Sequence, residues 1–168
     1  DTGLGSSGAG TGPSRVGIGV REFASPQELL GSVGTDLGYS QWHQVTQDHI
    51  DAFAQATGDH QWIHTDPQRA AAGPFGGTIA HGYLTLSLLP MLKWELMTVR
   101  SGMAINYGVN KVRFPAPVPV GSWLRGHVVI TDATETPAGV LVATQVTVEV
   151  RDSSKPVCVA ETLTLYRT

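Results

Sequence analysis

The sequence predicts an α+β domain in which an antiparallel sheet curls around a buried helix. Three observations indicate this fold class. Helical patterns fill much of the first hundred residues, residues 79–98 are apolar on nearly all faces, and the chain after Gly102 reads as strands joined by tight turns. The pattern leaves one alternative open, a plain two-layer sandwich with helices on one face of a sheet.

Length and glycine distribution define the domain. The chain has 168 residues, which favours one domain. Seven of its 20 glycines fall within residues 1–19. Segments so rich in Gly and Ser do not form a packed core, so we expect residues 1–19 to be a flexible leader, either a tag or a disordered segment. Residues 20–168 then form a single domain.

Helix signals follow one another in the first half of the chain. Residues 26–33 predict one or two helical turns, and residues 39–45 alternate weakly like a first strand. Thr46 is a good N-cap for a helix that Gly58 is well placed to end. Asp66 followed by Pro67 predicts the start of another short helix.

The long apolar segment, residues 79–98, predicts a buried helix rather than an amphipathic one. It contains Lys93 and Glu95 as well as several polar residues, which argues against membrane insertion. Pro90 lies within the segment, and we expect it to kink the helix or shift its boundary.

Strand patterns dominate the second half. The segment 103–114 predicts a strand that ends at a Pro-rich connection, and residues 123–131 and 157–166 read as strands too. In residues 140–150 five valines share one parity, at positions 140, 142, 146, 148 and 150, which is typical of a strand with one buried face. Tight turns at 137–139 and 152–155 would join the last strands as hairpins.

Charge and cysteine content exclude several classes of protein. The formal net charge is −3 and the 11 Lys and Arg residues are scattered, so nucleic-acid binding is not expected. The start of the chain does not read as a secretory signal. Cys158 is the single cysteine, which excludes an internal disulfide and fits a reducing compartment such as the cytoplasm. It lies in an apolar run, which favours packing over nucleophilic chemistry.

Candidate catalytic groups are concentrated between residues 56 and 89. Asp59 and His64 follow the first predicted helix in a turn-rich loop, where a carboxylate and an imidazole can converge on one water. Gly82 lies near the start of the buried helix. A free backbone N–H there suits a developing negative oxygen, and the absence of a side chain permits close approach. This combination fits addition of water to a conjugated thioester.

These residues also carry a resemblance. The run from Ala54 through Asp59 to His64 and Asp66, followed by Phe75-Gly-Gly-Thr-Ile-Ala-His-Gly82, resembles the (R)-specific enoyl-CoA hydratase group of the MaoC-like dehydratases. A Pro-rich stretch, 112–118, resembles the connection that the family has after its strand. The likeness covers about residues 39–167.

The resemblance implies a hot-dog fold, in which a sheet wraps around one long helix, and a homodimer. It implies reversible hydration of trans-2-enoyl-CoA to (R)-3-hydroxyacyl-CoA with no cofactor. Asp59 and His64 match the catalytic pair, and Gly82 matches the backbone donor to the thioester carbonyl. The family commonly has Asn-Pro where this chain has Gln61 and Trp62, a departure that bears on the loop geometry and the substrate range.

Further residues are candidates for substrate binding. Gln61 keeps an amide that can orient the loop, and Trp62 adds bulk beside the acyl pocket. His81 has two possible roles, a contact with substrate or a structural hydrogen bond. Tyr83 is expected to shape the pocket. Arg113 is a candidate for the CoA phosphates, as are Lys111 and Arg69.

Other functions remain as alternatives. An acyl-CoA thioesterase would release free thiol, and a non-catalytic acyl-thioester binding module would bind without turnover. A metal site would need His60 and His64 on a continuous helix, whereas Gly58 and Asp66 argue for a loop, so no metal is predicted.

Overall fold

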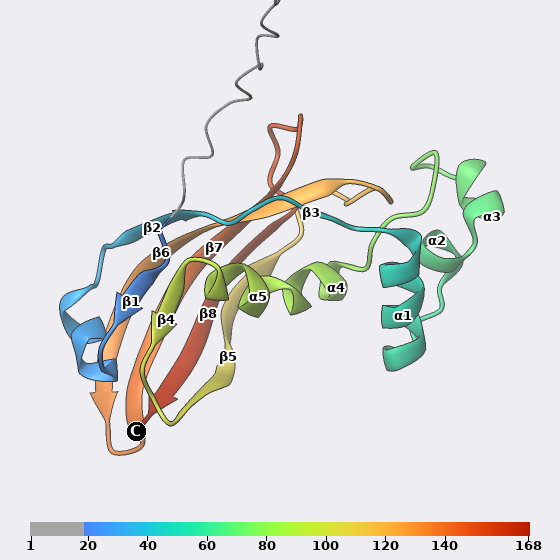
Figure 1. Cartoon of the computed structure of the whole chain (residues 1–168). Helices are drawn as coiled ribbons and strands as arrows, with labels where there is room; N and C mark the ends of the chain where they lie inside the picture. Colours follow the sequence, from blue (N-terminus) through green and yellow to red (C-terminus); the bar gives the residue numbers. More distant parts are fainter. Residues whose placement is uncertain (1–18) are drawn as a thin grey trace, which may run out of the picture.

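The computed structural model describes residues 19–168 and is built on a curved antiparallel sheet with helices on one face (Figure 1). The sheet has six strands in the order β2-β6-β7-β8-β5, with β3 also paired to β6. The strands are β2 (Asp36–Tyr39), β3 (His43–Gln44), β5 (Met103–Arg113), β6 (Trp123–Thr136), β7 (Gly139–Val150) and β8 (Cys158–Arg167). The α+β prediction is confirmed. The predicted leader, apart from Gly19, lies outside the described residues.

Alternating burial in the long strands places one face of the sheet in the core. Along β7 the side chains of Val140, Val142, Val146 and Val148 are all almost completely buried, as the two-residue period predicts. Strand β6 extends to Thr136, five residues beyond its predicted end, because it stays paired with β7 up to the hairpin at 137–139.

Two short helices, α4 (Gly82–Ser87) and α5 (Leu89–Trp94), replace the single helix predicted over 79–98. The break falls at Leu88, and Pro90 occupies the first turn of α5, where its missing N–H costs no hydrogen bond. Both helices lie against the concave face of the sheet (Figure 1). A β-carbon added to Gly126 of β6 would lie 3.1 Å from Leu92 Cδ1, so this glycine permits the close approach of α5.

Within this apolar segment, two aromatic residues expected to be buried are exposed, and one charged residue is buried. Tyr83 is 69% exposed and Trp94 is 68% exposed, whereas Lys93 is only 6% exposed. The two aromatic side chains are largely open to solvent. Lys93 instead faces β8, so the composition of the segment did not predict which face is buried.

Helices α1 (Gln47–Thr57), α2 (Trp62–Thr65) and α3 (Pro67–Ala71) pack mainly on one another and lie beyond one end of the sheet (Figure 1). We call residues 46–81, which contain them, the lateral segment. The Thr46 side chain accepts from His49 N, and Gly58 ends α1 with a left-handed φ of 82°, both as predicted. The Asp66 side chain caps α3 by accepting from Arg69 N at 3.0 Å. The stretch 59–64 is less of a loop than expected, because α2 begins at Trp62.

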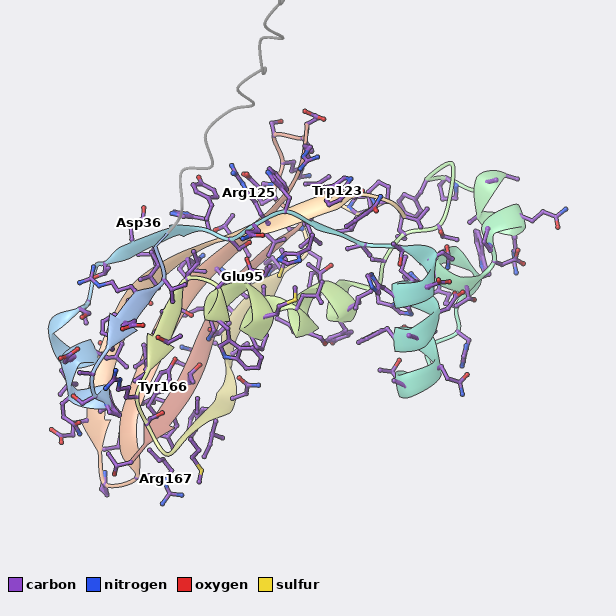
Figure 2. All side chains as sticks on the ribbon, in the orientation of Figure 1. Asp36, Glu95, Trp123, Arg125, Tyr166 and Arg167 are labelled. Carbon is purple, nitrogen blue, oxygen red and sulfur yellow. The ribbon has the colours of Figure 1, made fainter. Side chains whose placement is uncertain are left out.

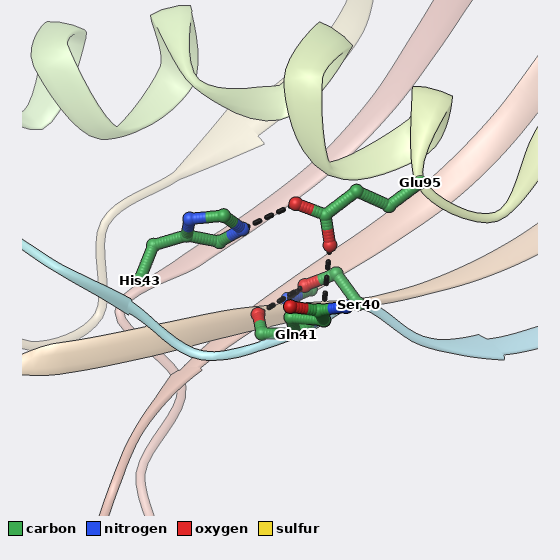
Figure 3. Close-up of polar contacts among 5 residues, drawn as sticks. Ser40, Gln41, His43 and Glu95 are labelled. Atoms are coloured by element: carbon green, nitrogen blue, oxygen red, sulfur yellow. Dashed lines mark hydrogen bonds and ion pairs between the residues drawn. The ribbon is translucent and has the colours of Figure 1, made fainter. Parts of the chain in front are cut away.

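A polar contact fixes the end of α5 to the segment between β2 and β3 (Figure 3). One Glu95 carboxylate oxygen accepts from Gln41 N at 2.8 Å, and the other pairs with His43 Nε2. In the same segment Ser40 Oγ accepts from Gly126 N at 2.9 Å. These contacts hold α5 over β6, at the far end of the helix pair from the lateral segment.

The outer face of the sheet carries alternating arginine and aromatic side chains, with Arg125 and Trp123 visible along β6 in Figure 2. The Arg125 guanidinium lies over the rings of Tyr39 and Trp42 at 4.1 and 4.5 Å, and Arg151 bridges Trp42 and Trp123. Cation–π contacts of this kind cover the apolar rings on the face that the helices leave open.

Three further elements complete the fold. A 3₁₀ helix, η1 (Pro26–Gly31), matches the helical turns predicted over 26–33. Strands β1 (Arg21–Phe23) and β4 (Met97–Val99) form a separate parallel pair that the sequence did not indicate.

Cys158 is fully buried in the core, where burial raises the pKa of its thiol to about 11, in line with a packing role. No helix in residues 19–168 is long and apolar enough to cross a membrane.

Candidate active site

Asp59, His64 and His81 meet where the lateral segment reaches the start of α4. One carboxylate or imidazole atom from each of the three side chains lies within 4.8 Å of the others. Asp59 is exposed, whereas His64 and His81 are buried. The structure therefore brings together the carboxylate and the imidazole that the sequence singled out, and adds a second imidazole.

The position of Asp59 follows from the end of α1. Gly58 turns the chain in the left-handed conformation, and Asp59 comes directly after it. The Asp59 carboxylate accepts from Gln61 N at 3.3 Å, which orients one of its oxygens toward the following turn. This contact involves the Gln61 backbone, and the Gln61 side chain is exposed.

His64 lies on α2 with its ring fixed by one backbone hydrogen bond. Its Nδ1 donates to the Ile79 carbonyl at 2.7 Å, which leaves Nε2 as the unprotonated nitrogen of the neutral ring. Nε2 has no hydrogen-bond partner among the described residues. The ring lines a cavity of about 300 Å³ together with Gly82, Thr85 and Phe114.

His81 contacts both catalytic candidates. Its Nε2 donates to the Asp59 carbonyl at 2.9 Å, and its ring stacks on that of His64 with 3.9 Å between centroids. Its Nδ1 is buried and has no partner in the part of the chain that the structure describes. This geometry matches the structural hydrogen bond that was weighed for His81, because the contact is with backbone rather than with open cavity.

Gly82 is the first residue of α4, and its N–H donates to no described protein group. A β-carbon at this position would lie 2.9 Å from Phe114 Cδ2, closer than real side chains approach, so any other residue would displace the partly exposed Phe114 ring. Gly82 and His64 line the same cavity.

Other candidate residues lie around this cavity rather than in its wall. Trp62 packs under the Arg69 guanidinium, 4.3 Å from the ring, and against Gly73. Tyr83 is exposed and meets Phe114 edge-on, with 6.1 Å between ring centroids. Arg113 is exposed at the end of β5 and donates to the Val112 carbonyl.

Gln47 is a site residue that the sequence did not reveal. Its Nε2 donates to the His64 carbonyl at 2.8 Å, and its Oε1 accepts from Thr78 Oγ1 at 2.6 Å. It thereby ties α1 to α2 and to the strand-like segment before α4. In the sequence it is one polar residue in the first turn of a helix, with no pattern that distinguishes it.

A metal ion would find its ligands in the same three residues. Asp59, His64 Nε2 and His81 Nδ1 are a set that zinc uses in proteins, and both rings donate their other nitrogen to a backbone carbonyl, as metal-bound imidazoles often do. The absence of a metal thus stays a prediction.

Comparisons with known proteins agree with this geometry. A family model described as "MaoC like domain" matches residues 28–152. The chain is 52% identical over 149 residues to 3-hydroxyacyl-thioester dehydratase Z of Mycobacterium tuberculosis, covering 88% of this chain and 99% of that protein. It is 46% identical to nodulation protein N of Rhizobium leguminosarum, covering 83% and 89% of the two chains.

Among solved structures, the R-hydratase PhaJ1 from Pseudomonas aeruginosa superposes with a TM-score of 0.66 at 23% identity, over 80% of this chain and 81% of that one. An (R)-hydratase from A. caviae matches with the same TM-score and identity, over 80% of this chain and 96% of that one. These similarities support the hot-dog fold.

Proposed function

The chain belongs to the family of MaoC-like domains and is a dehydratase of 3-hydroxyacyl thioesters, which makes it a hydro-lyase. We propose that it interconverts trans-2-enoyl-CoA and (R)-3-hydroxyacyl-CoA, with Asp59 and His64 as the catalytic pair. The observation that carries this proposal is the convergence of Asp59 and His64 beside the free Gly82 amide. The (R) configuration is supported by the fold shared with R-hydratases.

The spacing of the pair suits one shared water. A water that makes hydrogen bonds of about 2.8 Å to two groups holds them about 4 to 5 Å apart. The Asp59 and His64 atoms lie no more than 4.8 Å apart, close enough for one water to contact both. The hydrogen bond to the Ile79 carbonyl keeps the Nε2 lone pair of His64 available to accept from the water.

The reaction then follows with balanced atoms. As the water oxygen bonds to C3 of the enoyl group, one water proton passes to the Asp59 carboxylate, and the electron pair of the double bond shifts toward the thioester carbonyl. The Gly82 N–H stabilises the negative charge on that oxygen. The catalytic pair returns a proton to C2, so the net change is addition of one water. Dehydration is the same path in reverse.

No cofactor enters this scheme. We expect activity to persist after exhaustive treatment with a metal chelator, measured as hydration rate before and after dialysis. A loss that zinc restores would instead assign Asp59, His64 and His81 to a metal ion.

We further propose that the protein is a homodimer. Strand β5 is the edge of the sheet, paired on one side with β8, and it exposes a row of apolar side chains: Met103, Ile105, Tyr107 and Val109. An apolar unpaired edge favours pairing with another strand. Light scattering of the purified protein tests this, and Ile105→Lys is expected to shift the mass toward one chain. A cytoplasmic location stays a prediction from the lone cysteine.

The direct test is an assay with crotonyl-CoA. Loss of the enoyl thioester absorbance, formation of the (R)-3-hydroxy product on chiral analysis, and no release of free thiol are expected. Thiol release would indicate a thioesterase, and binding without turnover would indicate an acyl-thioester binding module.

A further inference from the structure

A second cavity, of about 370 Å³, lies between the helix pair and the strands β5 and β8. Its walls are largely apolar, with Leu86, Pro90, Val109 and Leu163 among them, and Lys93 also lines it. The reaction scheme above uses none of these residues.

Lys93 is a buried cation without a counter-ion. Its Nζ donates to Thr162 Oγ1 at 3.1 Å and to Thr164 Oγ1 at 3.0 Å. Across residues 19–168 no carboxylate forms an ion pair with it. An ammonium group has three N–H donors, so one remains without a partner. Burial lowers the pKa of Lys93 to about 8, which leaves the group mainly protonated at neutral pH.

The cavity that contains Lys93 and the catalytic cavity share no lining residue, but their lining residues follow one another along α4, α5 and β5. From one cavity to the next, the lining residues advance along the helices from Gly82 and Thr85 to Leu86 and Lys93, while on the sheet they run back from Phe114 toward Asn106. Lys93 is eleven residues after Gly82, which is at most roughly 16 Å at 1.5 Å per helical residue, because the break at Leu88 shortens the span. An acyl chain whose thioester lies at Gly82 would thus run toward Lys93.

We propose that Lys93 binds a carboxylate at the distal end of the acyl chain, so that the substrates include medium-length ω-carboxyacyl thioesters. This inference rests on the proposed function for the position of the thioester. Apolar walls suit the methylene chain, and a carboxylate would accept the free N–H of Lys93 and neutralise its charge. A plain alkyl end would leave the ammonium desolvated and unpaired, which is unfavourable.

The test separates binding from turnover. We would measure by calorimetry the affinity for two saturated thioesters, dodecanoyl-CoA and its ω-carboxy counterpart, which the enzyme cannot hydrate. The wild-type protein is expected to prefer the ω-carboxy ligand. Lys93→Met, which keeps the length of the side chain and removes its charge, is expected to reverse this preference through an affinity loss of about 10-fold to 100-fold for the ω-carboxy ligand.

Lys155→Met is the matched control, because Lys155 is exposed in the turn between β7 and β8 and should leave both affinities unchanged. Should Lys93→Met fail to fold, Lys93→Gln gives the same comparison. Equal ligand preference in the wild-type protein and the Lys93 variant overturns the inference. The inference is also overturned if the Lys93 variant keeps both ligand affinities but changes the oligomer mass in light scattering. A carboxylate from a second copy of the chain would then be the partner of Lys93.

Hydration of the plain unsaturated thioester, trans-2-dodecenoyl-CoA, by the wild-type protein is measured alongside. Poor hydration of this long plain substrate is expected from the unpaired Lys93 ammonium, so the proposed function is tested with crotonyl-CoA, which is too short to reach Lys93. Failure with crotonyl-CoA would count against the proposed function, whereas a missing carboxylate preference would count only against the role of Lys93.

Discussion

The sheet with α4 and α5 differs from the lateral segment in what holds it together (Figure 1). The sheet side is a continuous core of aliphatic side chains, many with no exposed surface. The lateral segment has helices of 11, four and five residues, and most of their side chains are exposed. Such short helices are not stable alone, so capping and side-chain hydrogen bonds must fix their geometry.

This difference separates stability from chemistry. Burial of apolar surface in the sheet supplies most of the folding free energy, while Asp59 and His64 stand on a segment positioned by a few polar contacts. Changes in the sheet should therefore lower stability, and changes in the lateral segment should lower activity. The four predictions below test this separation, in order of expected effect.

The largest effect is expected for Asp59→Asn and His64→Gln. Each removes a group proposed to handle the proton of the attacking water, so the hydration rate should fall about 100-fold or more. The free energy of unfolding should stay within about 0.5 kcal/mol for Asp59→Asn, because the side chain is exposed. Steady-state kinetics with crotonyl-CoA and denaturant melts measure the two.

Asp48→Asn and His60→Gln are the matched controls, since both residues are exposed in the lateral segment and outside the cluster. Parent-like rates for the Asp59 and His64 variants would refute their catalytic assignment.

The second prediction concerns the sheet side. Leu92 is completely buried against β6, so Leu92→Ala should lower the free energy of unfolding by about 2 to 5 kcal/mol. The protein that stays folded should keep a parent-like KM for crotonyl-CoA. A large change in KM without loss of stability would break the separation between the two regions.

The third prediction uses the buried charge of Lys93. Its pKa is lowered from 10.5 to about 8 in the folded state, so the unfolded chain binds more protons between those values and stability rises with pH across that range. Lys93→Met should raise the free energy of unfolding at pH 7 by about 1 to 3 kcal/mol. The gain over wild type should shrink from pH 8 toward pH 10, measured by denaturant melts at each pH. A constant difference across that range would contradict the assignment.

The smallest effect is expected for Gln47→Ala. It removes the hydrogen bonds to the His64 carbonyl and to Thr78, each contributing about 1 kcal/mol. We expect the hydration rate to fall about 5-fold to 10-fold, because His64 loses its tie to α1. Gln44→Ala serves as the control, since that side chain only donates to the Gly121 carbonyl at 3.2 Å. Equal rates for the two variants would show that Gln47 does not position His64.

Local signals in the sequence predicted a large part of this molecule. The valine alternation predicted β7, and Thr46, Gly58 and Asp66 marked the ends of α1 and the start of α3. These signals succeed because strand periodicity, caps and glycine conformations depend on residues within a few positions of one another.

The tertiary structure alone decided which distant residues meet. The Phe114 ring packs directly on Gly82, the His81 ring stacks on His64, and Lys93 is buried against β8 while Tyr83 and Trp94 are exposed. The physical reason is that segment 79–98 is apolar on nearly all faces, so no single amphipathic face orients it. The packing of Leu92 on Gly126 and the hydrogen bond from Gln41 N to Glu95 set the rotation of the helix. Both contacts join parts of the chain that are far apart in sequence.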